Sequence, residues 1–191
     1  YTYRFIVIAY HAGWFARTSE EFPVDYRTDA GEELNEQFGV LAYPSGMVNR
    51  TTVNGNLLLN PADWGTQTSG ILENEPKLKF SISKSFSQDS RVVSVEIEAT
   101  ALQVVGEMKV CVFITEDNLI SPQKTHVCEQ YPEGVIESYV HNHVFRTSLN
   151  GTWGTTVFTG GAFSEESQTI SVNGILGEEL NVNNLSIVCF A

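Results

Sequence analysis

Two pairs of potential metal ligands stand at the same spacing in the second half of this chain. His126 and Cys128 are separated by one residue, and so are His141 and His143. On extended backbone each pair would present both side chains on one face, and together they would offer the imidazole and thiolate donors that tetrahedral zinc prefers. Histidines on a strand that hydrogen-bond to neighbouring loops explain the same spacing. We predict this second arrangement for His141 and His143, with no metal and no cofactor.

The three cysteines could support redox chemistry only if two of them came together. Cys111, Cys128 and Cys189 lie 17 and 61 residues apart, which fits neither a Cys-x-x-Cys pair nor a zinc ribbon. Cys111 and Cys189 fall in apolar, strand-like runs, where a thiol behaves as a small buried hydrophobic group. We therefore expect these two thiols to be buried and reduced, and we predict no catalytic residue.

Aromatic side chains are the remaining candidates for binding. A long polar connection near the start of the chain holds four of them: Trp14, Phe15, Phe22 and Tyr26. Exposed aromatic residues on a loop can grip the face of a glycan or a peptide. The alternative is that they pack the loop onto a sheet. We expect Trp64 and Trp153 to be anchors of the core.

The balance of charge argues against one class of partner. The 191 residues include 11 Lys and Arg against 23 Asp and Glu, for a formal net charge of −12. Binding to nucleic acid requires a basic surface that neutralises phosphates, so we predict no nucleic-acid partner. The apolar runs also fall well short of the roughly 18 residues that a membrane-spanning helix needs.

The pattern in residues 1–75 indicates a small unit of helices and strands. An apolar, β-branched run predicts a first strand that is covered on both faces. A capping box that starts at Asp29 predicts one helix, and Asn60-Pro61 predicts the start of another. The expected elements are a strand at 3–10, a helix from 29 to 39, strands at 40–50 and 57–59 joined by a turn at Asn54-Gly55, and a helix at 61–72.

From residue 76 onward the apolar residues recur at every second position, which is typical of strands with one buried face. The composition changes at residues 73–77, and we take this as a domain boundary. About seven short strands separated by turn residues favour an antiparallel β-sandwich. The expected strands are 78–83, 93–97, 109–115, 138–148, 152–159, 168–172 and 184–190.

Phe38-Gly39-Val40 followed by Tyr43-Pro44 resembles a segment of thioredoxin-like folds that ends in a cis-proline. The order of the elements expected in residues 1–75 is similar to the second half of such a domain. The resemblance predicts a cis peptide bond before Pro44, a geometry found at only about 5–6% of X–Pro bonds. It also implies that a first strand and helix, with any Cys-x-x-Cys, would precede Tyr1.

A wider resemblance links the chain to the Bacteroidetes outer-membrane protein 28 family, lipoproteins that join a thioredoxin-like domain to a β-sandwich. The segments that carry it are HAG at 11–13, DYRT at 25–28, YPSGMVNR at 43–50, TEDN at 115–118, HNHVFR at 141–146 and NGTWG at 150–154. The resemblance implies an α+β chain. Residues 1–75 would form a truncated thioredoxin-like domain and residues 76–191 an antiparallel Ig-like β-sandwich.

The same resemblance implies a lipoprotein of the bacterial outer membrane that is held by a lipid anchor outside this chain, lacks catalytic activity and acts in adhesion. We hypothesise that it binds a protein or glycan partner. Four residues are expected to contact the partner: Tyr43, Pro44, Trp14 and Phe15. Three are expected to serve the structure: His141, His143 and Trp153. The alternative function is a thiol-disulfide oxidoreductase whose Cys-x-x-Cys lies upstream of Tyr1.

Overall fold

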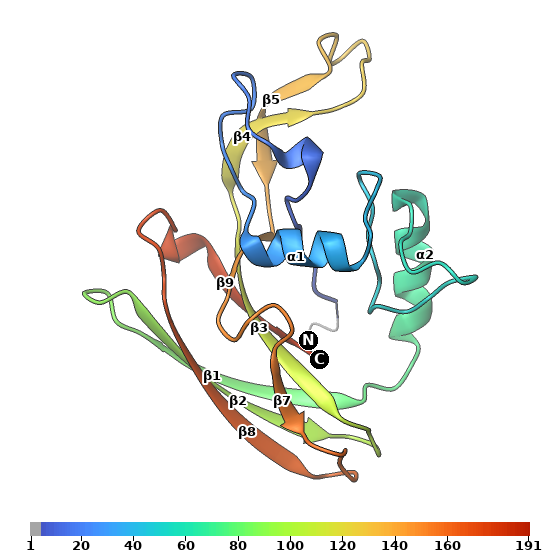
Figure 1. The fold of residues 1–191 in the computed structure, drawn as a ribbon, viewed down its shortest axis with the longest axis vertical. Helices are drawn as coiled ribbons and strands as arrows, with labels where there is room; N and C mark the ends of the chain where they lie inside the picture. The colour runs from blue at the N-terminus through green and yellow to red at the C-terminus, as the bar shows by residue number, and fades with distance from the viewer. Residues whose placement is uncertain (1–4) are drawn as a thin grey trace.

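Antiparallel strands dominate the computed structural model, which describes residues 5–191 (Figure 1). In this part of the chain nine strands form three sheets, and two α-helices precede the first strand. The protein is therefore α+β, as the sequence predicts. After Pro76 the only helical element among the described residues is a single 3-10 turn, η2 at Val182–Asn184.

The first sheet has three long strands in the order β1-β2-β8. Their bounds are β1 Leu78–Phe86, β2 Val92–Ala101 and β8 Ser167–Ile175. The predicted hairpin of β1 and β2 is confirmed, with Ile82 opposite Ile97 in its register. Val93, Val95 and Ile97 alternate along β2 and are buried, so one face of this sheet lies against the core.

The second sheet is built around one strand that is buried on both faces. The bounds are β3 Met108–Glu116, β6 Val144–Ser148, β7 Thr155–Phe158 and β9 Leu185–Phe190, and the last three all pair with β3. Val110, Val112 and Ile114 join the core shared with the first sheet. Cys111 and Phe113 project from the other face into a second cluster. This double burial explains why the β3 sequence is a continuous apolar run.

The third sheet is a two-stranded ribbon of β4 Leu119–Lys124 and β5 Val135–His141, which lies at the far end of the molecule from the first sheet (Figure 1). The prediction of a single strand at 138–148 is wrong. His143 has a left-handed φ of 57°, which interrupts extended backbone and separates β5 from β6. The sequence analysis also missed β4, whose residues from Ser121 to Lys124 lack apolar alternation.

The N-terminal segment and the 40–59 loop contain less strand than predicted. Ala9 forms a single parallel bridge with Val144, and residues 1–4 of the predicted first strand lie outside the described residues. The described start of that strand is not covered on both faces, since Phe5 is 55% exposed. The strands predicted at 40–50 and 57–59 are reduced to isolated bridges. The predicted turn does form, with positive φ at Asn54 and Gly55.

Both predicted helices are confirmed. They are α1 Asp29–Gln37 and α2 Pro61–Leu72. The capping residue of α1 is Thr28 rather than Asp29, because the Thr28 hydroxyl accepts a hydrogen bond from the Gly31 N–H at 3.0 Å. The Tyr43–Pro44 peptide bond is cis, as expected. Helix α1 lies between the β4–β5 ribbon and the first sheet (Figure 1) and touches β6.

Candidate functional site

The four residues predicted to contact a partner lie together. Trp14 and Phe15 occupy a short 3-10 turn, η1 at Trp14–Ala16, and are 65% and 64% exposed. Their rings meet edge to face with centroids 5.2 Å apart, and the Phe15 ring lies 5.8 Å from that of Tyr43. Pro44 follows Tyr43 and is exposed. We call Trp14, Phe15, Tyr43 and Pro44 the aromatic surface.

Hydrogen bonds to helix α1 hold this surface in place. The Tyr43 hydroxyl donates to the Asn35 side-chain oxygen at 2.6 Å. The Gly13 N–H donates to both carboxylate oxygens of Glu32 at 3.1 Å. Gly13 has a φ of 70°, and a Cβ there would overlap the Tyr43 hydroxyl, so the close approach of turn and loop requires glycine. The exposed rings are therefore presented on a fixed backbone.

His141 and His143 both bond to protein groups, as expected. The buried His141 Nε2 lies 2.9 Å from the Ser121 hydroxyl. The His143 backbone N–H donates to Asp117 Oδ1 at 2.6 Å, and its Nδ1 lies 3.2 Å from the same oxygen. The two imidazoles do not share one face of a strand, because the chain turns between them. Within residues 5–191 no three His, Cys, Asp or Glu side chains gather in an arrangement that could hold a metal ion.

The structure assembles a ring cluster that sequence analysis did not anticipate. The rings of His11, Tyr26 and His141 lie 5.1 to 5.3 Å apart, centroid to centroid. Tyr26 is 8% exposed, so for this residue the alternative of packing, rather than exposure, is confirmed. These residues are far apart in the sequence, and no local pattern relates them.

The histidines of this cluster have perturbed pKa values. The pKa of His11 is lowered from 6.5 to about 4. Burial is the main cause, and the nearby His141 and Arg146 add smaller effects. Burial also lowers the pKa of His141. His11 Nδ1 is buried and has no hydrogen-bond partner among the described residues. Both imidazoles are therefore neutral at neutral pH.

A buried ion pair lies beside the ring cluster. Arg146 donates to Glu116 Oε2 at 2.8 Å, and the two side chains are 13% and 1% exposed. The other Glu116 oxygen accepts the Asn181 backbone N–H at 2.9 Å. The Arg146 guanidinium also lies over the Tyr26 ring at 5.7 Å. A buried carboxylate needs such partners to offset its desolvation. Both residues lie in segments that carry the family resemblance, TEDN at 115–118 and HNHVFR at 141–146, but the sequence analysis did not predict that they pair.

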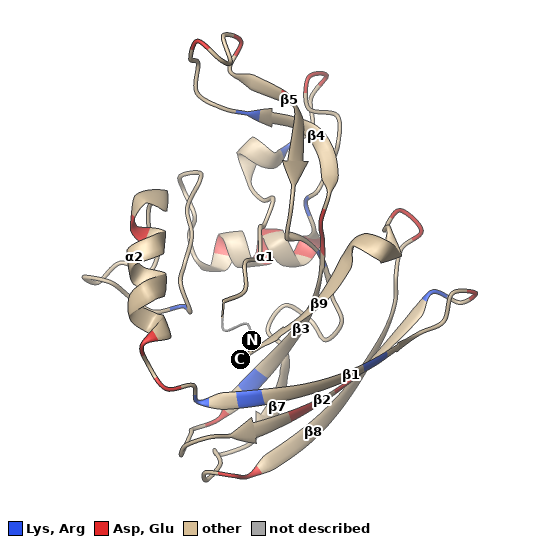
Figure 2. Cartoon of the chain, turned by 180° about the vertical axis from the view of Figure 1, so that it is seen from behind, with Lys and Arg blue, Asp and Glu red and all other residues tan. Residues whose placement is uncertain are grey.

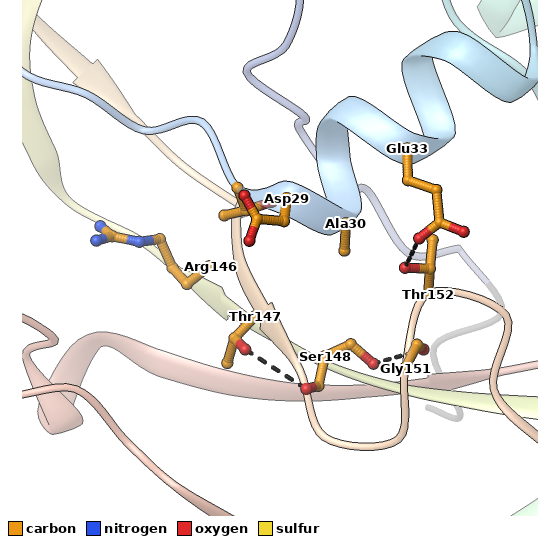
Figure 3. A pocket seen from close by; sticks show the side chains of 9 residues that line it. Asp29, Ala30, Glu33, Arg146, Thr147, Ser148, Gly151 and Thr152 are labelled. Carbon is orange, nitrogen blue, oxygen red and sulfur yellow. Dashed lines mark hydrogen bonds between the residues drawn. The ribbon is translucent and has the colours of Figure 1, made fainter.

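Arg146 lines two pockets. The smaller one, of about 330 Å³, lies between the start of α1 and the segment 146–152, as Figure 3 shows. The larger one, of about 580 Å³, is lined by Val24, Asp25, Tyr26, Glu116, Asn118, Leu119, Ile120, Arg146, Glu179, Asn181 and Asn184. Neither pocket includes a residue of the aromatic surface.

The wall of the smaller pocket carries a link between α1 and the loop after β6. Glu33 accepts hydrogen bonds from the Thr152 hydroxyl and the Trp153 indole (Figure 3 shows the first). These two bonds lower the pKa of Glu33, and the bond from Thr152 has the larger effect. The expectation that Trp64 and Trp153 are core anchors is wrong, because both are partly exposed. Each instead uses its indole N–H, Trp64 to the Leu59 carbonyl at 3.1 Å.

The three cysteines are free, and two of them are confirmed as buried. Burial raises the pKa of Cys189 to about 11 and also raises that of Cys111. A redox-active thiol needs a lowered pKa, so neither group is suited to thiol-disulfide exchange. Acidic side chains are carried by both helices and by turns at strand ends, whereas Lys and Arg are few (Figure 2).

The chain matches the model of a protein family described as "Outer membrane protein Omp28" over residues 31–191. It therefore belongs to the Omp28 family of outer membrane proteins, and its location is the outer membrane. The match includes Tyr43 and Pro44 and begins after Trp14 and Phe15. The comparisons found no matching curated protein and no matching solved structure. Neither helix in residues 5–191 is long and apolar enough to span a membrane.

Proposed function

We propose that this protein is a non-catalytic binding or adhesion module of the cell envelope and that it contacts a protein partner through the aromatic surface. The observation that carries the proposal is the exposure of Trp14 and Phe15, at 65% and 64%, beside Tyr43 and Pro44. Family membership supports the envelope setting.

The exposed rings of Trp14 and Phe15 can contribute binding free energy when a partner covers them. An aromatic side chain buries about 150–250 Å² when covered, so covering Trp14 and Phe15 would contribute on the order of 5 kcal/mol before the costs of association. Tryptophan is among the residues that most often dominate interfaces. Since hydrogen bonds already hold the Gly13 backbone and the Tyr43 side chain to α1, little further ordering is required on binding.

A protein segment suits this surface better than a glycan does. The two rings of Trp14 and Phe15 meet edge to face at 89°, so they form a corner that accepts an apolar side chain rather than a flat platform for a sugar. Pro44 is exposed beside them, so an extended peptide that contacts the rings can contact this residue as well.

The proposal extends to the fold and the origin of the chain. We propose a truncated thioredoxin-like domain at residues 1–75, an Ig-like sandwich at 76–191, and a Bacteroidetes lipoprotein anchored by a lipid outside this chain. The order of α1, the 40–59 hairpin loop and α2 supports the first domain. The core shared by two packed antiparallel sheets supports the second.

A photo-crosslinking experiment tests the binding site. A photoreactive amino acid at position 15 should capture an envelope or extracellular protein, and the same amino acid at Phe163, which is 71% exposed, should not. The purified partner should then bind the Trp14→Ala, Phe15→Ala double variant at least about tenfold more weakly, and the Phe163→Ala variant normally. If the partner binds both variants equally well, the aromatic surface is not its binding site.

A further inference from the structure

The larger pocket plays no part in the proposed function. It lies where the 24–26 loop, the start of β4 and the η2 turn meet, with Arg146 of β6 in its wall. Its volume of about 580 Å³ is within the ordinary range for small-molecule sites. The side chains that line it identify the chemistry of a ligand.

Arg146 offers unused donors to the pocket from a fixed position. The bond to Glu116 and the Tyr26 ring beneath it hold the guanidinium in one place. Of its five N–H donors, only one is bonded within the described part of the chain. A fixed guanidinium with free N–H groups is preorganised to donate to an oxygen acceptor.

Three amides add further free groups. The side-chain NH₂ groups of Asn118, Asn181 and Asn184 donate to no protein atom among residues 5–191, and neither does the Tyr26 hydroxyl. The Glu179 carboxylate likewise accepts no hydrogen bond there. The pocket therefore holds free donors and free acceptors side by side, which matches a ligand that is rich in hydroxyl groups.

The charges of the lining argue against an anionic ligand. Arg146 is paired with Glu116, and Asp25 is paired with Arg27 at 2.7 Å. Glu179 remains unpaired, in a chain of net charge −12. Leu119 and Ile120, the latter 67% exposed, supply an apolar wall. These features favour a neutral molecule with both hydroxyl groups and C–H faces.

We propose that this pocket binds a sugar ring of a neutral glycan. Arg146 and the asparagine amides donate hydrogen bonds to its hydroxyl oxygens, and Glu179 accepts from its hydroxyl groups. Leu119 and Ile120 pack against its C–H groups. The glycan site is separate from the aromatic surface, so this inference does not depend on the proposed function.

Ligand-observed NMR with neutral sugars tests the proposal, using glucose, galactose, mannose, N-acetylglucosamine and their disaccharides as probes. Arg146 is left unchanged, because its removal would strand the buried Glu116 carboxylate. The pocket variants are Glu179→Gln and Asn184→Ala. Their matched controls are the neighbouring Glu178→Gln and Asn183→Ala, whose side chains do not line the pocket. Inorganic phosphate and calcium are tested in parallel.

At least one sugar should bind the unchanged protein. Both pocket variants should weaken that binding by about tenfold, the loss expected for a missing hydrogen bond to a charged or buried group. Both controls and the Trp14→Ala, Phe15→Ala variant should retain it. Absence of sugar binding, binding of phosphate or calcium alone, or sugar binding that only the aromatic variant abolishes would overturn the proposal. The last result would also revise the partner of the aromatic surface, whereas the others would leave the proposed function intact.

Discussion

The Trp153 indole donates a hydrogen bond to the carboxylate of Glu33, 120 positions earlier in the chain. With the neighbouring bond from Thr152, it fastens helix α1 to the loop between β6 and β7. Residues on either side of the boundary expected at 75/76 are therefore joined by side chains as well as by the Ala9 to Val144 bridge.

This link predicts a pH-dependent loss of stability in Trp153→Phe. The lowered pKa of Glu33 means that the bonds stabilise the fold fully above the ordinary glutamate range and lose this effect as the pH falls through the folded-state value. The variant should have a lower Tm at neutral pH, and the difference should shrink in acid. Trp64→Phe is the control, because its lost bond is to the Leu59 carbonyl and its deficit should not change with pH.

We expect substitution of Asn150 to lower the free energy of unfolding, because its side chain bonds to the buried strand β3. Its side chain accepts the Val112 N–H at 2.9 Å and donates to the Val110 carbonyl at 2.8 Å, so it continues the pairing of β3 between β6 and β7. Asn150→Ala would leave two groups of fully buried residues unpaired, at a cost of about 2 kcal/mol. Urea unfolding should show this loss, whereas the exposed Asn183→Ala should lie within about 0.5 kcal/mol of the unchanged protein.

Gly154 predicts a steric effect at the same strand. Its φ is 70°, and an added Cβ would lie 2.4 Å from the Val110 carbonyl oxygen. Gly154→Ala should therefore destabilise the protein by more than about 2 kcal/mol, since backbone must shift as well as adopt a disfavoured conformation. Gly55 also has a positive φ but open space around it, so Gly55→Ala should cost about 1 kcal/mol. Equal losses in denaturant unfolding would contradict the steric argument.

Local signals explain which parts of the fold could be predicted from the sequence. The helix-start patterns at Asp29 and at Asn60-Pro61 and the alternation along β1 and β2 depend on neighbouring residues, and these elements are confirmed, although the residue that caps α1 is Thr28. The left-handed turn at His143 leaves no such signal, because the bonds that accompany it, to Asp117 and between Asn118 and Asn142, join residues more than 20 positions apart. The apolar run at 3–10 is typical of a full strand, yet among its described residues only Ala9 forms a β-bridge.

Of the candidate sites, one is indicated by local sequence and the others depend on tertiary packing. Residue type predicted the aromatic surface, since Trp14 and Phe15 are large apolar residues in a polar connection. The clustering of His11, Tyr26 and His141 depends on tertiary packing of three remote segments. The larger pocket likewise depends on β6 carrying Arg146 to meet Asn184 near the end of the chain. Neither arrangement has a counterpart in local sequence.

His11 predicts how the protein responds to acid. Its folded-state pKa of about 4 lies below the ordinary value of 6.5, so between these two values the unfolded chain binds a proton that the folded chain does not. The free energy of unfolding should therefore fall as the pH drops from 6.5 to 4, by about 3 kcal/mol from this group. His11→Phe keeps a ring in the cluster, removes the unpartnered Nδ1, and should lose correspondingly less stability over this range. The control is His126→Phe, at an exposed position. Its free energy of unfolding in urea should depend on pH as that of the unchanged protein does. If the His11→Phe variant shows this same pH dependence, the buried imidazole does not govern acid stability.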